Sequence, residues 1–375
     1  MFQSTKPKGI TLVAAILAGV AACSCLSVYA ETSYDSGASS DKPSGSGVAA
    51  VKAYLVKQVI KIDDAADDFL KNAEEYQKII DANGGDYNKA AINNGGQILP
   101  LLIKMQGDYR NLHQNGYETV EGIAAGVKEL VDYDIYLDSG VPKSQSSTDS
   151  PAAPVVIRTA SGELVADRSG NIFHYVIEPA LWGANKDFVK RLSPEVSQKL
   201  HGVVVLPRAD VLLAAAKNCK QETEKFVVDA KAWQPTPDAC LGALVWMTPT
   251  FNTYFNDLSD SLYDPTGRYV SESRVLDMRG IMGSLQFIYE AIMPPLQQKD
   301  PALASQLKSE YAGIMHHIDQ ADARDRKTRV ANSKLSKLEI EEMADQAKTM
   351  SDQLAPQLKQ SAAIMGLKIP PKPYL

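Results

Sequence analysis

The sequence lacks the short motifs that mark most enzyme families. It contains no HExxH zinc motif, no GxxxxGK[ST] phosphate-binding loop, no GxSxG nucleophile elbow and no GxGxxG dinucleotide fingerprint. It also contains no CxxC pair and no cysteine–histidine spacing typical of a zinc site. These absences weaken every enzymatic interpretation and leave carboxylates and histidines as the groups that can carry chemistry.

An excess of positive charge is also missing. The 39 Lys and Arg residues face 45 Asp and Glu residues, for a formal net charge of −6. Loss of a signal that carries Lys6, Lys8 and no acid would make the chain more acidic still, at about −8. Phosphate groups attract clustered basic side chains, so we expect no nucleic-acid partner and no binding to anionic membrane surfaces.

No apolar run reaches the roughly twenty residues of a membrane helix. The run from Ile10 to Ala22 follows two lysines and stops at Cys23, which is typical of a secretory signal over residues 1–30. A retained membrane helix is the weaker alternative. Cleavage after Ala30 would release a soluble chain, whereas cleavage before Cys23 would leave a lipid-anchored lipoprotein. Either way, we expect the protein in the periplasm or elsewhere outside the cytoplasm.

Cysteine is scarce, and only Cys219 and Cys240 of the four lie beyond the signal. Two thiols in an oxidising compartment predict one disulfide. Closing a loop of about twenty residues would stabilise the fold by roughly 3 kcal/mol. The alternative is a pair of buried, reduced cysteines.

A flexible spacer over residues 31–47, rich in Ser and Gly, is predicted to precede a folded domain over residues 48–368. Apolar residues recur every three or four positions from Val51 to Ala73, which predicts a long first helix. The fold class is mainly α, a bundle of two packed helical halves meeting near Arg208. Further helices are predicted at Tyr87–Leu112, Tyr117–Val131, Phe173–Gly183, Pro194–Val204, Ala209–Lys231, Leu241–Leu262, Leu276–Gln298, Pro301–Ala323 and Lys334–Met365.

One segment, Gly140 to Asn171, breaks the helical pattern. Three prolines are followed by two short β-prone runs, Val155–Arg158 and Gly162–Val165. This pattern predicts a small β-hairpin inserted between helices.

His174 and Glu178 stand four residues apart in an otherwise apolar run. On a helix these positions share one face, so the two side chains could hold one ion. Imidazole combined with carboxylate suits iron, zinc or copper better than calcium. A buried histidine bonded to a carboxylate is the alternative, and Pro179 disfavours helical geometry at Glu178.

Two other polar groups are interpreted from pattern alone as solvated helix faces. The first comprises Glu118, Glu121, Asp132, Asp134 and Asp138. The second is His316-His317-Ile318-Asp319 with Asp322, whose polarity continues into Arg324-Asp325-Arg326-Lys327.

Three blocks of sequence resemble the imelysin-like family, most closely the helical domain of EfeO-type periplasmic iron-uptake proteins. Tyr117-Glu118-Thr119-Val120-Glu121 with Asp132-Tyr133-Asp134 is similar to the family's YExxE and Asp-Leu-Asp. Phe173-His174 through Ala180-Leu181-Trp182 resembles its Phe-His-x-x-Glu-x-Ala-Leu-Trp block. Arg268-Tyr269, Asp277 and the helix to Pro295-Leu296 resemble the third block. The likeness runs in order from Val51 to Leu367.

The resemblance implies a metal site at Glu121, Asp134, His174 and Glu178. It implies a transition metal, most of all iron, with copper or zinc as alternatives, and a membrane permease as partner. The chain departs from the family in spacing its histidine and glutamate by four instead of three, which predicts a bulge in the helix. Ser271-Glu272-Ser273-Arg274 replaces Ser-His-Thr-Asp, and Gly280-Ile281-Met282-Gly283 replaces a polar stretch. Arg274 would repel an ion unless Glu272 or Asp277 compensates.

The leading hypothesis is a non-enzymatic, extracytoplasmic protein that captures a metal, most of all iron, for an Efe-type uptake system. A metal-free protein that binds a polysaccharide or another envelope protein on the same fold is the first alternative. A metallopeptidase with Glu178 as general base is the second.

Overall fold

The computed structural model describes residues 46–140, 155–168, 170–262, 274–331 and 333–373. The expected signal, Cys23 and most of the spacer lie outside these residues. The described chain is mainly helical, as predicted. None of its helices combines the length and apolar character needed to cross a membrane.

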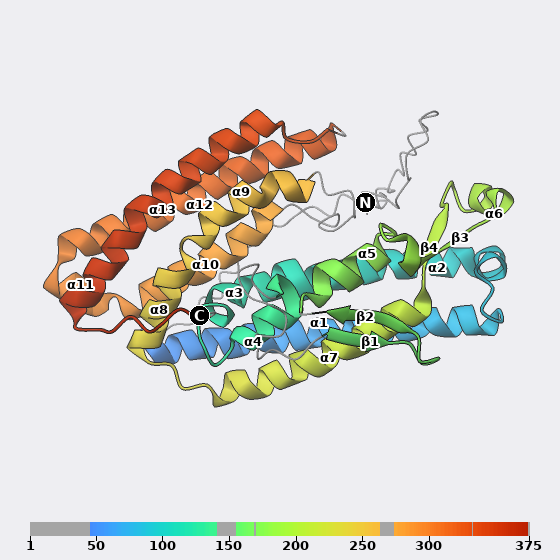
Figure 1. Cartoon of the computed structure of the whole chain (residues 1–375), viewed down its shortest axis with the longest axis horizontal. Coiled ribbons are helices and arrows are strands. Elements are labelled where there is room, and N and C mark those ends of the chain that lie inside the picture. The colour runs from blue at the N-terminus through green and yellow to red at the C-terminus, as the bar shows by residue number, and fades with distance from the viewer. Residues whose placement is uncertain (1–45, 141–154, 169, 263–273, 332, 374–375) are drawn as a thin grey trace, which may run out of the picture.

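Three long helices form the N-terminal bundle: α1 (Val48–Ala82), α2 (Tyr87–Leu112) and α7 (Ala209–Ala232). Helix α1 packs against both others (Figure 1). Its predicted apolar stripe, which includes Val51, Leu55 and Phe69, is fully buried. The Asp86 side chain caps α2 by accepting from two backbone N–H groups.

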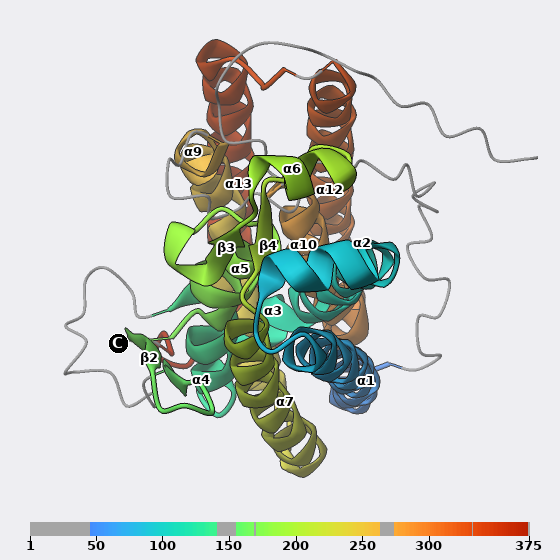
Figure 2. The same cartoon turned by 90° about the vertical axis from the view of Figure 1, so that its right-hand side faces the viewer.

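The C-terminal bundle contains α8 (Pro237–Met247), α9 (Thr250–Leu262), α10 (Arg274–Ile292), α11 (Pro294–Lys299), α12 (Pro301–Val330) and α13 (Lys337–Met365). Helices α12 and α13 pack together and stand away from α1, α2 and α7 (Figure 2). Helix α10 joins the bundles by packing on α3 (Glu118–Ala124). Because α7 packs on α1, the halves divide after Ala232, and not near Arg208 as expected.

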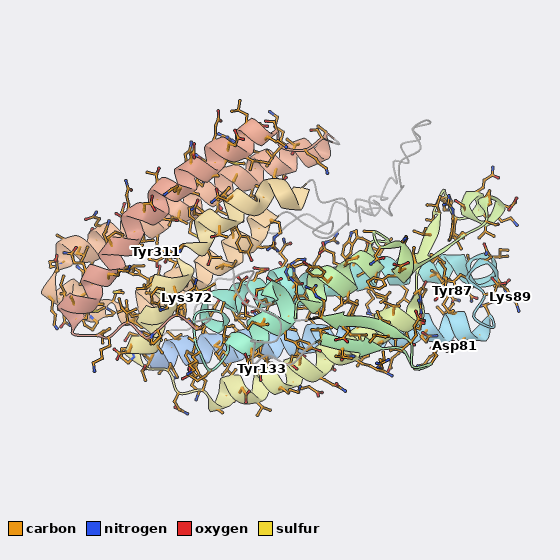
Figure 3. The ribbon with its side chains drawn as sticks, viewed as in Figure 1. Asp81, Tyr87, Lys89, Tyr133, Tyr311 and Lys372 are labelled. Atoms are coloured by element: carbon orange, nitrogen blue, oxygen red, sulfur yellow. The ribbon has the colours of Figure 1, made fainter. Side chains whose placement is uncertain are left out.

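Figure 3 labels two buried tyrosines, Tyr133 in the N-terminal bundle and Tyr311 in the C-terminal bundle. Tyr311 of α12 is fully buried, and its hydroxyl lies 3.3 Å from Thr248 Oγ1 at the end of α8. Tyr133, in the short helix α4 (Val131–Asp134), stacks on Phe226 of α7 with ring centroids 4.4 Å apart. These contacts attach the short helices of each half to the long ones.

Short helices, turns and strands lie between α4 and α7. The predicted hairpin is confirmed as the antiparallel pair β1 (Val155–Arg158) and β2 (Leu164–Arg168). The sequence predicted a helix over residues 194–204, but α6 covers only Pro194–Lys199. Residues 200–204 of the predicted helix instead lead into β4 (Val205–Pro207), which pairs with β3 (Val189–Arg191).

The predicted disulfide does not form. Cys219 and Cys240 are buried free thiols, on α7 and α8 respectively. Helix α7 packs mainly on α1, whereas α8 packs mainly on α10, so the two thiols belong to different helix interfaces. Burial raises the pKa of the Cys240 thiol to about 12, which leaves it protonated and unreactive.

Candidate metal centre

Three π-helical turns surround one buried cluster of polar side chains. They are η1 (His113–Tyr117), η2 (Ile135–Ser139) and η3 (Phe173–Ile177). Each closes with a backbone hydrogen bond across five residues; in η3 the N–H of Glu178 donates to the carbonyl of Phe173. Each turn accommodates one extra residue in its helix, a feature found frequently at functional sites.

The turn η3 resolves the unusual spacing of His174 and Glu178. The predicted bulge lies between them, and Glu178 is helical (φ −62°, ψ −52°) despite the proline that follows. Pro179 is the second residue of the short helix α5 (Glu178–Leu181), in its first turn, where a missing N–H is tolerated. The bulge therefore offsets the extra residue and keeps both side chains on the same side of the helix.

The imidazoles of His113 and His174 meet at the carboxylate of Asp138. Asp138 Oδ1 lies 2.8 Å from Nε2 of His174 and 3.1 Å from Nε2 of His113. All three side chains are almost completely buried, and one nitrogen or oxygen of each lies within 4.8 Å of the others. Two nitrogens and one carboxylate in this arrangement could hold a transition-metal ion.

Glu178 orients His174 from behind. Its Oε2 lies 2.6 Å from Nδ1 of His174, on the opposite side of the ring from Asp138. A carboxylate on the second nitrogen fixes the tautomer of a metal-binding histidine and leaves Nε2 for the ion. The structure thus brings Glu178 to His174, but among the described residues no potential metal group includes it.

Glu118 extends the cluster toward α10. Its Oε1 lies 2.8 Å from His113 Nε2, and it forms a second potential metal group with His113 and Asp277. The side chain is fully buried, and its carboxylate faces both the imidazole of His113 and the side chain of Glu121. A buried carboxylate beside a second acid is costly unless a cation or a proton compensates its charge.

Glu121 and Asp134 occupy different positions in the site. Glu121 forms a third potential metal group with Glu118 and Asp138, and the Tyr254 hydroxyl donates to it at 3.3 Å. Asp134 accepts a hydrogen bond of 2.8 Å from Tyr117 and belongs to none of the groups found among the described residues. Of the four ligands implied by sequence, His174 and Glu121 thus lie in potential metal groups.

Burial and charge shift the acid–base properties of the cluster. Burial, reinforced by Asp277 and Asp138, raises the pKa of Glu118 well above its ordinary value. Burial and the neighbouring Glu118 raise the pKa of Glu121 in the same direction. Burial opposes the shift at Asp138, but the facing His174 and His113 hold its pKa well below the usual range. Asp138 therefore stays ionised at the centre of the cluster.

Arg274 is the cationic member of the site. Its Nη1 donates to Asp277 Oδ2 at 2.7 Å and lies 3.1 Å from Nε2 of His174. Its guanidinium carbon lies 4.6 Å from the centre of the Tyr254 ring. Asp277 therefore compensates the charge of Arg274, as one of the two sequence alternatives expected.

Backbone contacts hold η2 and η3 together at the base of the hairpin insertion. The carbonyl of Ile135 accepts hydrogen bonds from the N–H groups of Gly140 (3.1 Å) and Asn171 (2.9 Å). Asn171 Oδ1 then accepts from the N–H of His174 at 2.9 Å. Gly170 has φ +82°, and a Cβ there would lie 1.9 Å from the Ile135 carbonyl oxygen. Only glycine fits so close to this backbone.

Sequence patterns did not predict His113 as a ligand, and on their own they indicated that Glu118, Glu121, Asp134 and Asp138 are solvated, although the family resemblance implied Glu121 and Asp134 as ligands. These acids are buried; of the group, only Asp132 is exposed. The expectation failed because other helices cover the face that carries the acids. The residues Tyr109, His113 and Tyr117 do recur at helical spacing, which was the available signal for His113.

Comparison with known proteins gives no further identification. No protein-family model matches the chain, and no curated protein matches it. The imelysin-like resemblance stays an expectation from the sequence, and the function is argued from the site itself.

Proposed function

We propose that this protein binds a transition-metal ion outside the cytoplasm and captures it for an uptake system. The observation that carries the proposal is the convergence of His113, His174 and Asp138, with Glu178 on the far nitrogen of His174. Iron is the leading cargo, and copper and zinc are alternatives. Two imidazole nitrogens favour these ions over calcium and magnesium, which prefer oxygen ligands.

The surroundings support binding. The buried carboxylate of Glu118 lies 2.8 Å from Nε2 of His113 and would supply a further oxygen ligand. The ordered, buried frame fits capture, because ligands held in place lose little freedom when an ion binds. A membrane permease that accepts the ion is the partner that this role requires, and export by the signal at residues 1–30 would bring the domain to it.

The proposal is tested by titrating iron(II), copper(II) and zinc(II) into the purified protein in a calorimeter. We expect one high-affinity site in the wild type and its loss in the double variant His113→Ala with His174→Ala. His316→Ala is the matched control, because His316 is exposed on α12. Absence of binding in the wild type, or unchanged binding in the double variant, would refute the proposal.

Arg274 favours a second function, a metal-free protein that binds an envelope partner. The guanidinium already supplies positive charge to His174 and Asp277. In that case the cluster is a structural network, and the wild type would bind none of the three ions. The same titration therefore separates the two functions.

A further inference from the structure

Arg274 approaches the nitrogen that a metal ion would use. It is the first residue of α10, and its side chain is only 13% exposed. Its Nη1 lies 3.1 Å from His174 Nε2, while Asp138 Oδ1 lies 2.8 Å from the same nitrogen. A single Nε2 can donate a proton to the carboxylate or accept one from the guanidinium, but it cannot do both.

The other nitrogen of the ring makes the conflict sharper. Nδ1 of His174 lies 2.6 Å from Glu178, so its proton is best placed there. Nε2 then has two options: it donates to Asp138 and directs its proton toward the Arg274 guanidinium as well, or it accepts from Arg274 and leaves the contact with Asp138 without a proton. A metal ion at this position would satisfy the nitrogen and the carboxylate together.

The contacts of Arg274 also indicate that its positive charge substitutes for that of a metal ion. Asp277, which pairs with Arg274 at 2.7 Å, belongs to the potential metal group that includes His113 and Glu118. His174 belongs to the group that includes His113 and Asp138. Arg274 thus contacts a member of two of the three potential groups. The positive charge of its guanidinium therefore lies beside the side chains that would hold a metal ion.

We propose that Arg274 is an intramolecular competitor of the metal, and that an ion enters only by displacing the guanidinium from His174 and Asp277. This inference rests on the proposed metal-binding function and names the ions it selects. Ions that gain strongly from imidazole, such as copper(II) and zinc(II), displace Arg274. Calcium and magnesium gain little from a nitrogen ligand and are rejected.

The test compares Arg274→Gln and Arg274→Lys with the wild type in calorimetric titrations of zinc(II) and calcium(II). Removing a full charge next to a ligand nitrogen should tighten zinc(II) binding by about tenfold or more in Arg274→Gln. The same variant should acquire measurable calcium(II) binding. Arg274→Lys keeps the charge and should bind zinc(II) no tighter than the wild type. Arg279→Gln is the matched control, because Arg279 lies on the same helix but pairs with Asp319.

A second measurement follows zinc(II) binding in the wild type and needs a variant only to assign one resonance, so that a change in a variant's affinity is not the only readout. Nitrogen-15 labelling of arginine side chains should show one guanidinium resonance that shifts when zinc(II) binds, assigned to Arg274 by its absence in Arg274→Gln. If the wild type binds zinc(II) while that resonance stays fixed, or Arg274→Gln binds no tighter, the inference is wrong and the proposed function stands. If only Arg274→Gln binds, Arg274 blocks the site and the capture function is wrong. If neither binds, both are wrong.

Discussion

Glu178 lies 2.6 Å from His174 Nδ1, across a π-helical turn that adds one residue between them. The contact places the carboxylate behind the ring and directs Nε2 toward Asp138 and His113. Four-residue spacing on a regular helix would rotate the pair differently, so the bulge and the histidine orientation are parts of one arrangement.

Replacing Glu178 should weaken metal binding without removing a ligand. We expect Glu178→Ala to lower zinc(II) affinity by about 10- to 100-fold, because loss of such an orienting carboxylate frees the histidine ring. Glu178→Gln retains an acceptor for Nδ1–H and should lose less. Glu195→Ala, at an exposed position in α6, serves as the control. Equal affinity of Glu178→Ala and the wild type in calorimetry would contradict the role.

Asn171 should control both stability and the position of His174. Its φ of +58° is tolerated by Asn and Gly but strained for Ala. We expect Asn171→Ala to destabilise the fold by about 1–3 kcal/mol, from backbone strain and loss of the hydrogen bond to the His174 N–H. Asn171→Gly removes only the hydrogen bond and should cost less. Chemical denaturation measures both, and equal losses would show that strain is not involved.

Two glycines of α10 should respond oppositely to the same change. A Cβ on Gly280 would lie 2.8 Å from the Cβ of Glu118, so Gly280→Ala should destabilise by about 1–3 kcal/mol through overpacking. A Cβ on Gly283 meets no atom within 4 Å. Gly283→Ala should stabilise by about 0.5–1 kcal/mol, because Ala favours helix. Thermal unfolding of both variants checks this, and a stable Gly280→Ala would contradict the close approach of α10 and α3.

Because His317 is buried, we expect the free energy of unfolding to fall in mild acid. Burial lowers its pKa below the ordinary 6.5, with Arg324 and His316 acting in the same direction. Below about pH 6.5 the unfolded chain binds a proton that the folded chain does not, so stability falls as the pH drops toward the folded pKa. His317→Gln should flatten this dependence between pH 7 and 5, whereas His316→Gln should not. Identical melting profiles for the wild type and His317→Gln would contradict it.

The long helices were predictable because their signals are local. Apolar periodicity and end signals placed α2 at residues 87–112 and α7 within one residue of its observed end. The hairpin followed from prolines and β-branched residues in the same way. The second small sheet was missed, because β3 and β4 have three residues each and pair across the thirteen residues 192–204.

The site was only partly predictable because its residues meet through tertiary packing. His174 and Glu178 are close in sequence, and their spacing indicated a bulge. The hairpin insertion separates Asp138 from His174 and Glu178 in the sequence, and α3 lies between His113 and Asp138. No local pattern predicts that η1, α3, η2 and η3 meet at one place. The interpretation of the acids as solvated failed for this reason: a polar helix face is buried when other helices cover it and carry polar groups that face it.

Binding of one metal ion by His113, His174 and Asp138 can be observed by anomalous X-ray diffraction at the absorption edge of zinc or iron, on crystals of the metal-loaded protein. We expect a single strong peak within bonding distance, about 2.0–2.2 Å, of His113 Nε2, His174 Nε2 and an Asp138 oxygen. A peak elsewhere, or none in a crystal soaked to saturation, would contradict this expectation.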